Sequence, residues 1–184
     1  MSKFKQLIEQ IMAKRVSIHQ EDSIGIAVQL LKAGKVIAVP TDTLYGLACD
    51  ATNIQAVTSM YHVKQRNEHK PVALCFGEVF QLESWVLVNH LPKNLLKSIL
   101  PGPVTLLLNS NKNVHKYICR DGKIGVRVPN YQFIRQLTVK LGSPVALTSA
   151  NLSSEPSAVS CEEFPAIWNK IPAVFDGGVT NIIS

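Results

Sequence analysis

Three separated segments of the chain carry side chains that could bind anions and a polar small molecule. They read PTDTLYGL at residues 40–47, KQRNEHKP at residues 64–71 and TSANLSSEPS at residues 148–157. Lysine and arginine neutralise anionic groups, and hydroxyl and amide side chains hydrogen-bond polar molecules. Each segment lies at the end of a strongly apolar run. Together they indicate a site for a nucleotide and a small acid.

The second segment supplies three cations, Lys64, Arg66 and Lys70. Lys64 and Arg66 are two residues apart at the end of a predicted helix, so they would point in different directions on helical geometry. If the chain becomes extended at Gln65, both can face one side. The alternative is an exposed, charged helix end, because cations near a helix C-terminus suit its dipole.

Arg127 interrupts the apolar run IGVRV at residues 124–128. An arginine in a buried strand is costly unless it is paired or faces a ligand cavity. Two interpretations stay open at this point. Arg127 faces a ligand, or it forms an ion pair with an acid such as Asp50, Asp121 or Asp176.

Hydroxyl and amide side chains follow several predicted strands and turns. Ser149 and Asn151 come directly after a buried strand, and Thr105 follows the rigid turn Pro-Gly-Pro. Such side chains can bind a ligand, but they also cap helices and close turns, which is favoured on spacing alone. The same alternatives hold for Thr41 and Thr43, and a β-strand threonine is the simpler interpretation of Thr105.

Several other mechanisms lack their motifs. The chain has no GxxxxGK[ST] phosphate loop, no GxGxxG dinucleotide loop, no GxSxG nucleophile turn and no paired carboxylates at a useful spacing. Its five histidines and four cysteines lack zinc-ligand spacing, so we expect no protein-held metal. We expect the cysteines to be reduced packing thiols of an intracellular protein. No apolar run reaches the roughly 18–20 residues of a membrane span.

Composition indicates one globular domain. Of the 184 residues 46% are hydrophobic and 17% charged, which is typical of a folded chain with a sizeable core. The net charge of +6 suits anionic partners such as nucleotides or RNA, or simply a basic surface. Apolar residues between Phe4 and Met12 recur at helical spacing, so residues 1–19 are predicted to be an N-terminal helix or extension before a domain at 20–184. The alternative is an amphipathic presequence, because this segment also holds several lysines and an arginine.

Helix and strand signals then alternate. The expected helices lie at 22–33, 54–64, 92–100, 134–141 and 161–168, and the expected strands at 35–39, 72–76, 104–108, 124–128, 144–148 and 173–176. Asn53 is expected to cap the second helix, and Gly34 and Gly142 to end the first and fourth. The alternation predicts a mixed α/β domain of three layers, with a twisted, mostly mixed sheet flanked by helices. Ligands in such folds lie beyond strand ends, where all three segments are expected.

Taken together, the segments resemble the YrdC/TsaC family, the L-threonylcarbamoyladenylate synthases. The resemblance covers about residues 20–178 and rests on five motifs in order. These are PTDTLYGL, KQRNEHKPVAL, PGPVT, GVRVP and TSANLS. The segments SSEPS, EEFPAIW and DGG are most similar to the animal branch.

The resemblance implies a nucleotidyltransferase reaction. L-Threonine captures bicarbonate as a carbamate, whose oxygen attacks the α-phosphate of ATP, leaving L-threonylcarbamoyladenylate and pyrophosphate. ATP would be a substrate and bring Mg²⁺ with it. A separate transferase complex would then modify the tRNA adenosine beside the anticodon. The implied location is the cytoplasm, with mitochondria as a second location.

The resemblance also implies roles for single residues. Lys64 and Arg66 are assigned to catalysis, and Thr43 and Arg127 to L-threonine. The residues implied to bind ATP are Arg66, Lys70, Thr105, Ser149, Asn151 and Ser157.

Two departures from the family pattern stand out. Asn67 replaces a common proline, and the chain ends at GGVTNIIS, before the usual Ser-Thr strand and Arg-Pro-Gly segment. The domain is therefore expected to be truncated at its C-terminal end. Two alternatives to an active enzyme remain: a module that binds double-stranded RNA or tRNA, and an inactive paralogue.

Overall fold

The computed structural model describes residues 14–65, 71–111, 114–153 and 155–180. The helices are α2 (Ser23–Lys32), α3 (Ile54–Lys64), α4 (Leu95–Ile99), α5 (Gln132–Leu141) and α6 (Pro165–Trp168), with short 3₁₀ helices at Val79–Ser84 and Cys161–Glu163. The strands are β1 (Lys14–Ser17), β2 (Ile37–Pro40), β3 (Tyr45–Asp50), β4 (Ala73–Cys75), β5 (Leu106–Asn109), β6 (Cys119–Arg120), β7 (Lys123–Arg127), β8 (Val145–Ser149) and β9 (Ala173–Asp176).

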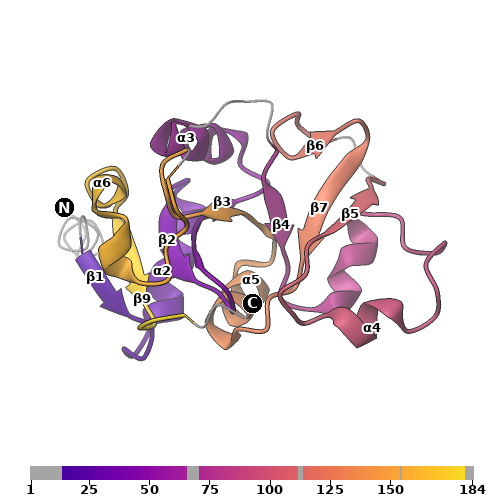
Figure 1. The fold of residues 1–184 in the computed structure, drawn as a ribbon, viewed down its shortest axis with the longest axis horizontal. Helices are drawn as coiled ribbons and strands as arrows, with labels where there is room; N and C mark the ends of the chain where they lie inside the picture. Colours follow the sequence, from indigo (N-terminus) through magenta and orange to yellow (C-terminus); the bar gives the residue numbers. More distant parts are fainter. Residues whose placement is uncertain (1–13, 66–70, 112–113, 154, 181–184) are drawn as a thin grey trace.

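All nine strands of the described residues belong to one sheet, in the order β1-β9-β2-β3-β8-β4-β7-β5, with β6 paired to β7 (Figure 1). Strand β9 is parallel to β1 and β2, and β4 is parallel to β7. The remaining pairs are antiparallel. The predicted mixed sheet is confirmed.

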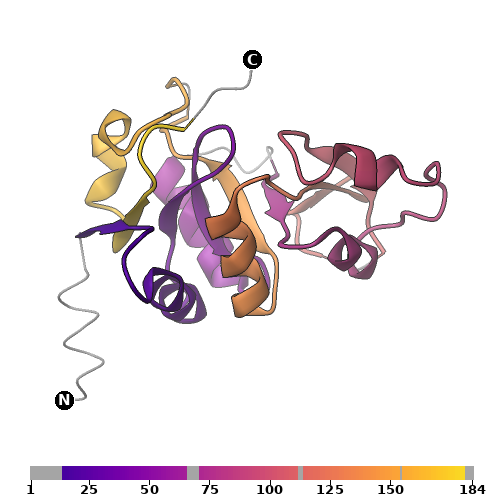
Figure 2. The same cartoon turned by 90° about the horizontal axis from the view of Figure 1, so that it is seen from below.

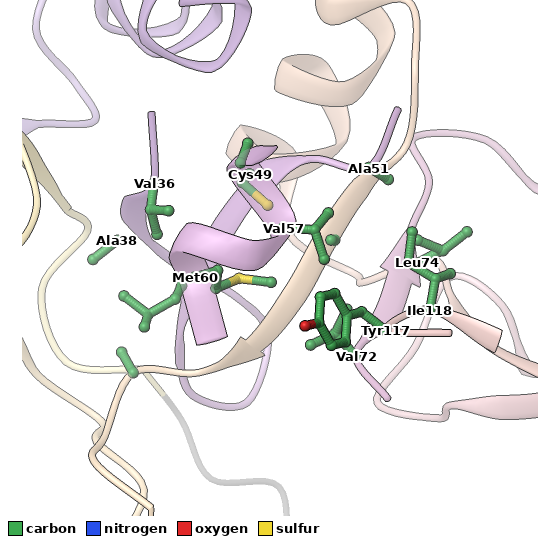
Figure 3. Close-up of a cluster of buried hydrophobic side chains, with 14 of the residues drawn as sticks. Val36, Ala38, Cys49, Ala51, Val57, Met60, Val72, Leu74, Tyr117 and Ile118 are labelled. Carbon is green, nitrogen blue, oxygen red and sulfur yellow. The ribbon is translucent and has the colours of Figure 1, made fainter. Parts of the chain in front are cut away.

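Helices cover both faces of this sheet, as Figures 1 and 2 show. Side chains of α2 and α5 form one core with the strands, including Leu30, Ile134 and Cys75. Side chains of α3 form the other core, where Val57 and Met60 lie among the buried residues drawn in Figure 3. The three-layer α/β prediction is therefore confirmed, and each layer buries an apolar face against the sheet.

Local signals set the helix ends where the sequence predicts them. The Asn53 side chain accepts a hydrogen bond from the Ala56 N–H at 3.1 Å and begins α3. At the other end Gln65 adopts φ 52°, so the helix stops immediately after Lys64. Gly142, with φ 82°, ends α5 in the left-handed conformation that glycine adopts without strain.

Three strands are absent from the sequence predictions, namely β1, β3 and the short β6. Residues 14–17, which the sequence placed in the N-terminal extension, form β1 and pair with β9. Strand β3 lies where only a polar segment was predicted, and Gly46 concealed its strand character. A Cβ at Gly46 would lie 2.7 Å from a methyl carbon of Leu147, so the close approach of β8 excludes a side chain there. The boundary predicted at residue 20 between extension and domain stays a prediction.

Candidate active site

The turn between β2 and β3 is built by Thr41. Its hydroxyl donates to the Leu44 carbonyl at 2.7 Å and accepts from the backbone N–H groups of Thr43 and Leu44, each at 3.2 Å. The turn-forming interpretation of Thr41 is therefore correct. Because Thr41 holds the turn, the Thr43 hydroxyl is available to contact residues from other strands.

The segment after β8 lies against the same turn through the backbone of Tyr45. The Ala150 N–H donates to the Tyr45 carbonyl at 2.9 Å, and the Tyr45 N–H donates to the Ala158 carbonyl at 2.8 Å. Gly46 of β3 pairs with Ser149 of β8. The first and third polar segments, about a hundred residues apart in sequence, therefore form one neighbourhood.

Lys64 brings the second segment to the same place. It is the last residue of α3 and only 4% exposed. Its ammonium donates to the backbone and hydroxyl oxygens of Ser149, at 2.6 and 3.0 Å, and to the backbone and amide oxygens of Asn151, at 3.0 and 2.6 Å. We call these three residues the lysine cradle. Lys64 is thus a buried, oriented cation and not a solvated helix end.

Asn151 is held from both sides of its amide. Its oxygen accepts from Lys64, and its nitrogen donates to the Glu155 carbonyl. The Ser153 N–H also donates to the Lys64 carbonyl at 3.2 Å. These bonds fix Ser149, Asn151 and Ser153 against the end of α3.

Arg127 forms an ion pair, but its partner is an acid that the sequence analysis did not name. Its Nη2 donates to Asp42 Oδ1 at 2.5 Å and to Thr43 Oγ1 at 3.0 Å. Asp42 Oδ2 accepts from the Asn130 N–H at 2.8 Å. We call Arg127, Asp42, Thr43 and Asn130 the arginine cluster. Both charged side chains are largely buried, with 13% of Arg127 and 5% of Asp42 exposed.

The acids proposed for Arg127 have other partners. Asp50 accepts from Thr52 and Ser143, Asp121 lies 3.6 Å from Arg120, and Asp176 binds Arg15. The ion-pair interpretation of Arg127 is therefore confirmed, but none of the three acids given as examples is the partner, because the fold brings the β2–β3 turn to the end of β7.

Thr105 lies beside the arginine cluster on the open face of β5 and β7. Gly125 shares a face with Arg127, since alternate residues of a strand point the same way. A Cβ at Gly125 would lie 3.4 Å from the Thr105 methyl group and 3.6 Å from the Ala73 Cβ. These small residues line a hollow of about 450 Å³ together with Pro71, Leu107 and Lys123. Thr105 is exposed there.

The structure gives less information on the remaining predicted site residues, Ser157, Arg66 and Lys70. Ser157 is exposed on the segment that leads to Ala158. Arg66 and Lys70 lie outside the described residues, so their roles stay predictions. The structure brings together Thr43, Lys64, Arg127, Ser149 and Asn151, with Thr105 on the adjoining strand.

Two residues of this neighbourhood were missed by the sequence analysis. Asp42 stands beside Thr43 in PTDT, and this adjacency was the only available signal. Thr180 donates through its hydroxyl to the Thr43 carbonyl at 2.9 Å, and its N–H donates to the Val159 carbonyl at 2.8 Å. Thr180 therefore holds the β2–β3 turn from the C-terminal side.

The turn after β9 that delivers Thr180 is held by Tyr45 and Asp176. The buried Tyr45 hydroxyl donates to the Gly178 carbonyl at 2.7 Å and accepts from the Gly177 N–H at 3.0 Å. Burial raises the pKa of Tyr45 well above its ordinary value, so the phenol keeps its proton. Burial also opposes ionisation of Asp176, but hydrogen bonds from the Gly178 N–H and Arg15 outweigh it and lower the pKa of this carboxyl.

The four cysteines are free, and three of them are buried. Burial raises the pKa of Cys75, next to Arg127 in the β4–β7 ladder, to about 12. Within the described residues, no group of three or more His, Cys, Asp and Glu side chains could hold a metal ion. The same residues include no helix with the length and hydrophobicity needed to cross a membrane.

A protein-family model named Sua5/YciO/YrdC, and described as telomere recombination, matches residues 29–184. The chain belongs to the Sua5/YciO/YrdC family. The resemblance drawn from the five sequence motifs is confirmed. The match includes every strand of the sheet except β1.

Curated relatives of this family carry the name threonylcarbamoyl-AMP synthase. The cow protein is 43% identical over 85% of this chain, and the human protein is 42% identical over the same share. A putative threonylcarbamoyl-AMP synthase from Methanocaldococcus jannaschii is 34% identical over 79% of the chain. The chain spans 57% of the cow protein and 56% of the human protein, about half the length of these relatives.

Solved Sua5/YciO/YrdC structures share the fold. Sua5 of P. abyssi in complex with L-threonine superposes with a TM-score of 0.80 at 30% identity, covering 90% of this chain and 50% of that one. YciO of E. coli superposes with a TM-score of 0.82 at 25% identity, covering 92% and 86%. The sheet and its flanking helices are thus those of the family.

Proposed function

We propose that this protein synthesises L-threonylcarbamoyl-AMP and pyrophosphate from L-threonine, bicarbonate and ATP. The observation that carries the proposal is the convergence of Thr43, Lys64, Arg127, Ser149 and Asn151, from three separated segments, on one neighbourhood. Relatives 42–43% identical over 85% of the chain are named for this product, which supports the assignment.

The reaction must bring together anions that repel one another. The threonine amine captures bicarbonate as a carbamate with loss of water, and a carbamate oxygen then displaces pyrophosphate from the α-phosphate of ATP. Such a transfer needs positioning and charge stabilisation more than covalent help from the protein. A buried, oriented cation such as Lys64 suits that task, because an ammonium in low dielectric acts strongly on developing negative charge.

The two polar clusters suit different substrates. We assign the arginine cluster, through Thr43 and Arg127, to L-threonine, because a guanidinium binds a carboxylate and a hydroxyl binds an amine or alcohol. The lysine cradle, with Ser149 and Asn151, is assigned to the nucleotide.

The exposed Thr105 and Ser157 flank the nucleotide in this proposal, and Arg66 and Lys70 bind its phosphates. The hollow beside Thr105 stays open because Gly125 and Ala73 add little volume to its floor. Mg²⁺ is proposed to arrive with ATP, since Mg²⁺ is commonly bound through substrate phosphates and few protein groups.

We further propose that the product passes to a separate transferase complex that modifies the adenosine beside the anticodon of tRNA. This requires the protein to work where that complex works, in the cytoplasm or in mitochondria. A direct contact with tRNA is consistent with the net charge of +6.

The test is pyrophosphate release by the purified protein with ATP and Mg²⁺, with L-threonine or bicarbonate omitted in turn. Release should require both, and the product should have the mass of threonylcarbamoyl-AMP. Activity that ignores either substrate contradicts the proposal. A protein that releases no pyrophosphate but binds duplex RNA in a strongly salt-dependent way would be an RNA-binding module instead.

A further inference from the structure

Asp42 stands at the centre of the arginine cluster and uses both carboxylate oxygens there. Oδ1 accepts from Arg127 and Oδ2 accepts from the Asn130 N–H, at 2.5 and 2.8 Å. Only 5% of the side chain is exposed. Both carboxylate oxygens of Asp42 therefore accept hydrogen bonds from protein groups, and the side chain does not face a substrate.

The hydrogen bonds around Asp42 determine which atoms of its neighbours remain available. Arg127 Nη2 carries two protons, one donated to Asp42 and one to Thr43. Arg127 Nε is buried and has no hydrogen-bond partner among the described residues. The two protons on Nη1 are thus left for a ligand, and the Nε proton lies buried beside them.

The same network orients the hydroxyl of Thr43. Thr41 donates its own proton to the Leu44 carbonyl at 2.7 Å, so in the 3.2 Å contact between the two hydroxyls Thr43 is the donor. Thr43 accepts from Arg127 at the same time. What Thr43 can still offer is an acceptor lone pair, which suits the N–H or O–H group of a substrate.

We propose that Asp42 is a positioning residue that holds the guanidinium of Arg127, and through it the hydroxyl of Thr43, in the orientation that receives the amino-acid substrate. This inference rests on the function proposed above. The ion pair carries no net charge, so Arg127 contributes direction and donor geometry more than charge. A carboxylate is required because it accepts from both Arg127 and Asn130, whereas an asparagine amide offers one acceptor and one donor group.

The kinetic test measures pyrophosphate release by the wild type, Asp42→Asn and Asp42→Glu. L-Threonine is varied at saturating ATP in one series, and ATP is varied at saturating L-threonine in the other. Asp42→Asn should raise the KM for L-threonine by about 10-fold or more and change the KM for ATP by less than about 3-fold, because only one substrate meets the arginine cluster. Asp42→Glu keeps two acceptors and should recover part of the loss.

Glu78→Gln is the matched control, since it removes the acid of the ion pair with Arg135 at 2.9 Å, outside the arginine cluster. It should leave both KM values unchanged. Equal changes in both KM values for Asp42→Asn, or none, would overturn the proposal and leave Asp42 as a structural tie between the β2–β3 turn and Asn130.

A second measurement does not depend on turnover. In protein labelled with ¹⁵N-arginine, the Arg127 side-chain resonances, assigned from the Arg127→Lys spectrum, should report a guanidinium with hindered rotation in the wild type. Asp42→Asn should release it, and Glu78→Gln should not. Free rotation in the wild type, or no change in Asp42→Asn, overturns the inference even if the enzyme is active. The protein could instead be inactive while the Arg127 guanidinium is hindered in the wild type and free in Asp42→Asn. That result would refute the proposed function but would leave the positioning role of Asp42 standing.

Discussion

The lysine cradle and the arginine cluster each surround a largely buried cation, but they do so with different chemistry. The four acceptors given above for Lys64 are neutral oxygens of Ser149 and Asn151. The Nη2 of Arg127 instead meets the carboxylate of Asp42 and the hydroxyl of Thr43. Hydrogen bonds donated to neutral oxygens orient a charge without cancelling it, whereas an ion pair cancels it and fixes the geometry of both partners.

This difference suits the two clusters to different tasks. The lysine cradle is suited to stabilising negative charge on phosphates. The arginine cluster is suited to reading the shape of a small zwitterion by directed hydrogen bonds. The following experiments test whether the two clusters differ in this way.

The largest effect is expected from breaking the ion pair on one side. Arg127→Ala leaves Asp42 buried without its cation and should lower the free energy of unfolding by about 3–5 kcal/mol. Asp42→Ala together with Arg127→Ala should cost less than Arg127→Ala alone, because no uncompensated charge remains. Urea denaturation of the single and double variants measures this. A double variant less stable than both single variants would mean that the pair does not act as a unit.

Removing the other cation should act mainly on catalysis. Lys64→Ala should lower turnover at least ~100-fold, on the scale of losing an aimed charge-stabilising donor. The matched control is Lys32→Ala, which removes an exposed lysine that is likewise the last residue of its helix. It should keep wild-type turnover. The same loss is expected for Arg66→Ala, and near-normal rates in both site variants would refute their assigned roles.

Asp176 lies outside both clusters and tests how much a single charge contributes to the stability of this fold. Asp176 has a lowered pKa in the folded protein, so its stabilising effect is present above its ordinary pKa of 3.8 and is lost as pH falls below that value. Asp176→Asn should therefore be less stable than the wild type at pH 7, and the difference should shrink as the pH falls below 3.8 and through the lowered pKa of the folded state. Denaturation at several pH values checks this, and a pH-independent difference would show that charge is not the cause.

The smallest effect is expected within the lysine cradle. Ser149→Ala removes one of the acceptors described for Lys64, the hydroxyl at 3.0 Å, and keeps the backbone oxygen at 2.6 Å. Stability should fall by only about 1 kcal/mol, since the ammonium retains several partners. Turnover should fall less than in Lys64→Ala. A loss as large as that of Lys64→Ala would show that the hydroxyl acts on the substrate directly.

Much of the architecture was predictable because its signals are local. The Asn53 cap, the Gly142 stop and the apolar runs of β2, β4, β7 and β8 act within a few residues of their own positions. Strand β3 escaped prediction because it begins inside the polar segment PTDTLYGL and contains Gly46, and what makes it a strand is pairing with β2 and β8.

The candidate site divides in the same way. That Arg127 needs a partner or a ligand follows from an arginine in an apolar strand. Which acid it meets does not follow, since Asp42 lies 85 positions away and no periodicity links them. The burial of Lys64 was equally hidden, because a lysine at a helix end is usually solvated, whereas this one meets Ser149 and Asn151 at the end of β8.

By itself, the sequence determined the main helices, six of the strands, the family and the three polar segments, because caps, periodicity and motifs are properties of neighbouring residues. Only the tertiary structure decided which of those polar side chains meet, and that one cation is held by neutral oxygens and the other by a carboxylate. The physical reason is that a buried charge takes its partners from whatever the packed strands bring within about 3 Å, and strand packing depends on contacts between residues far apart in the chain.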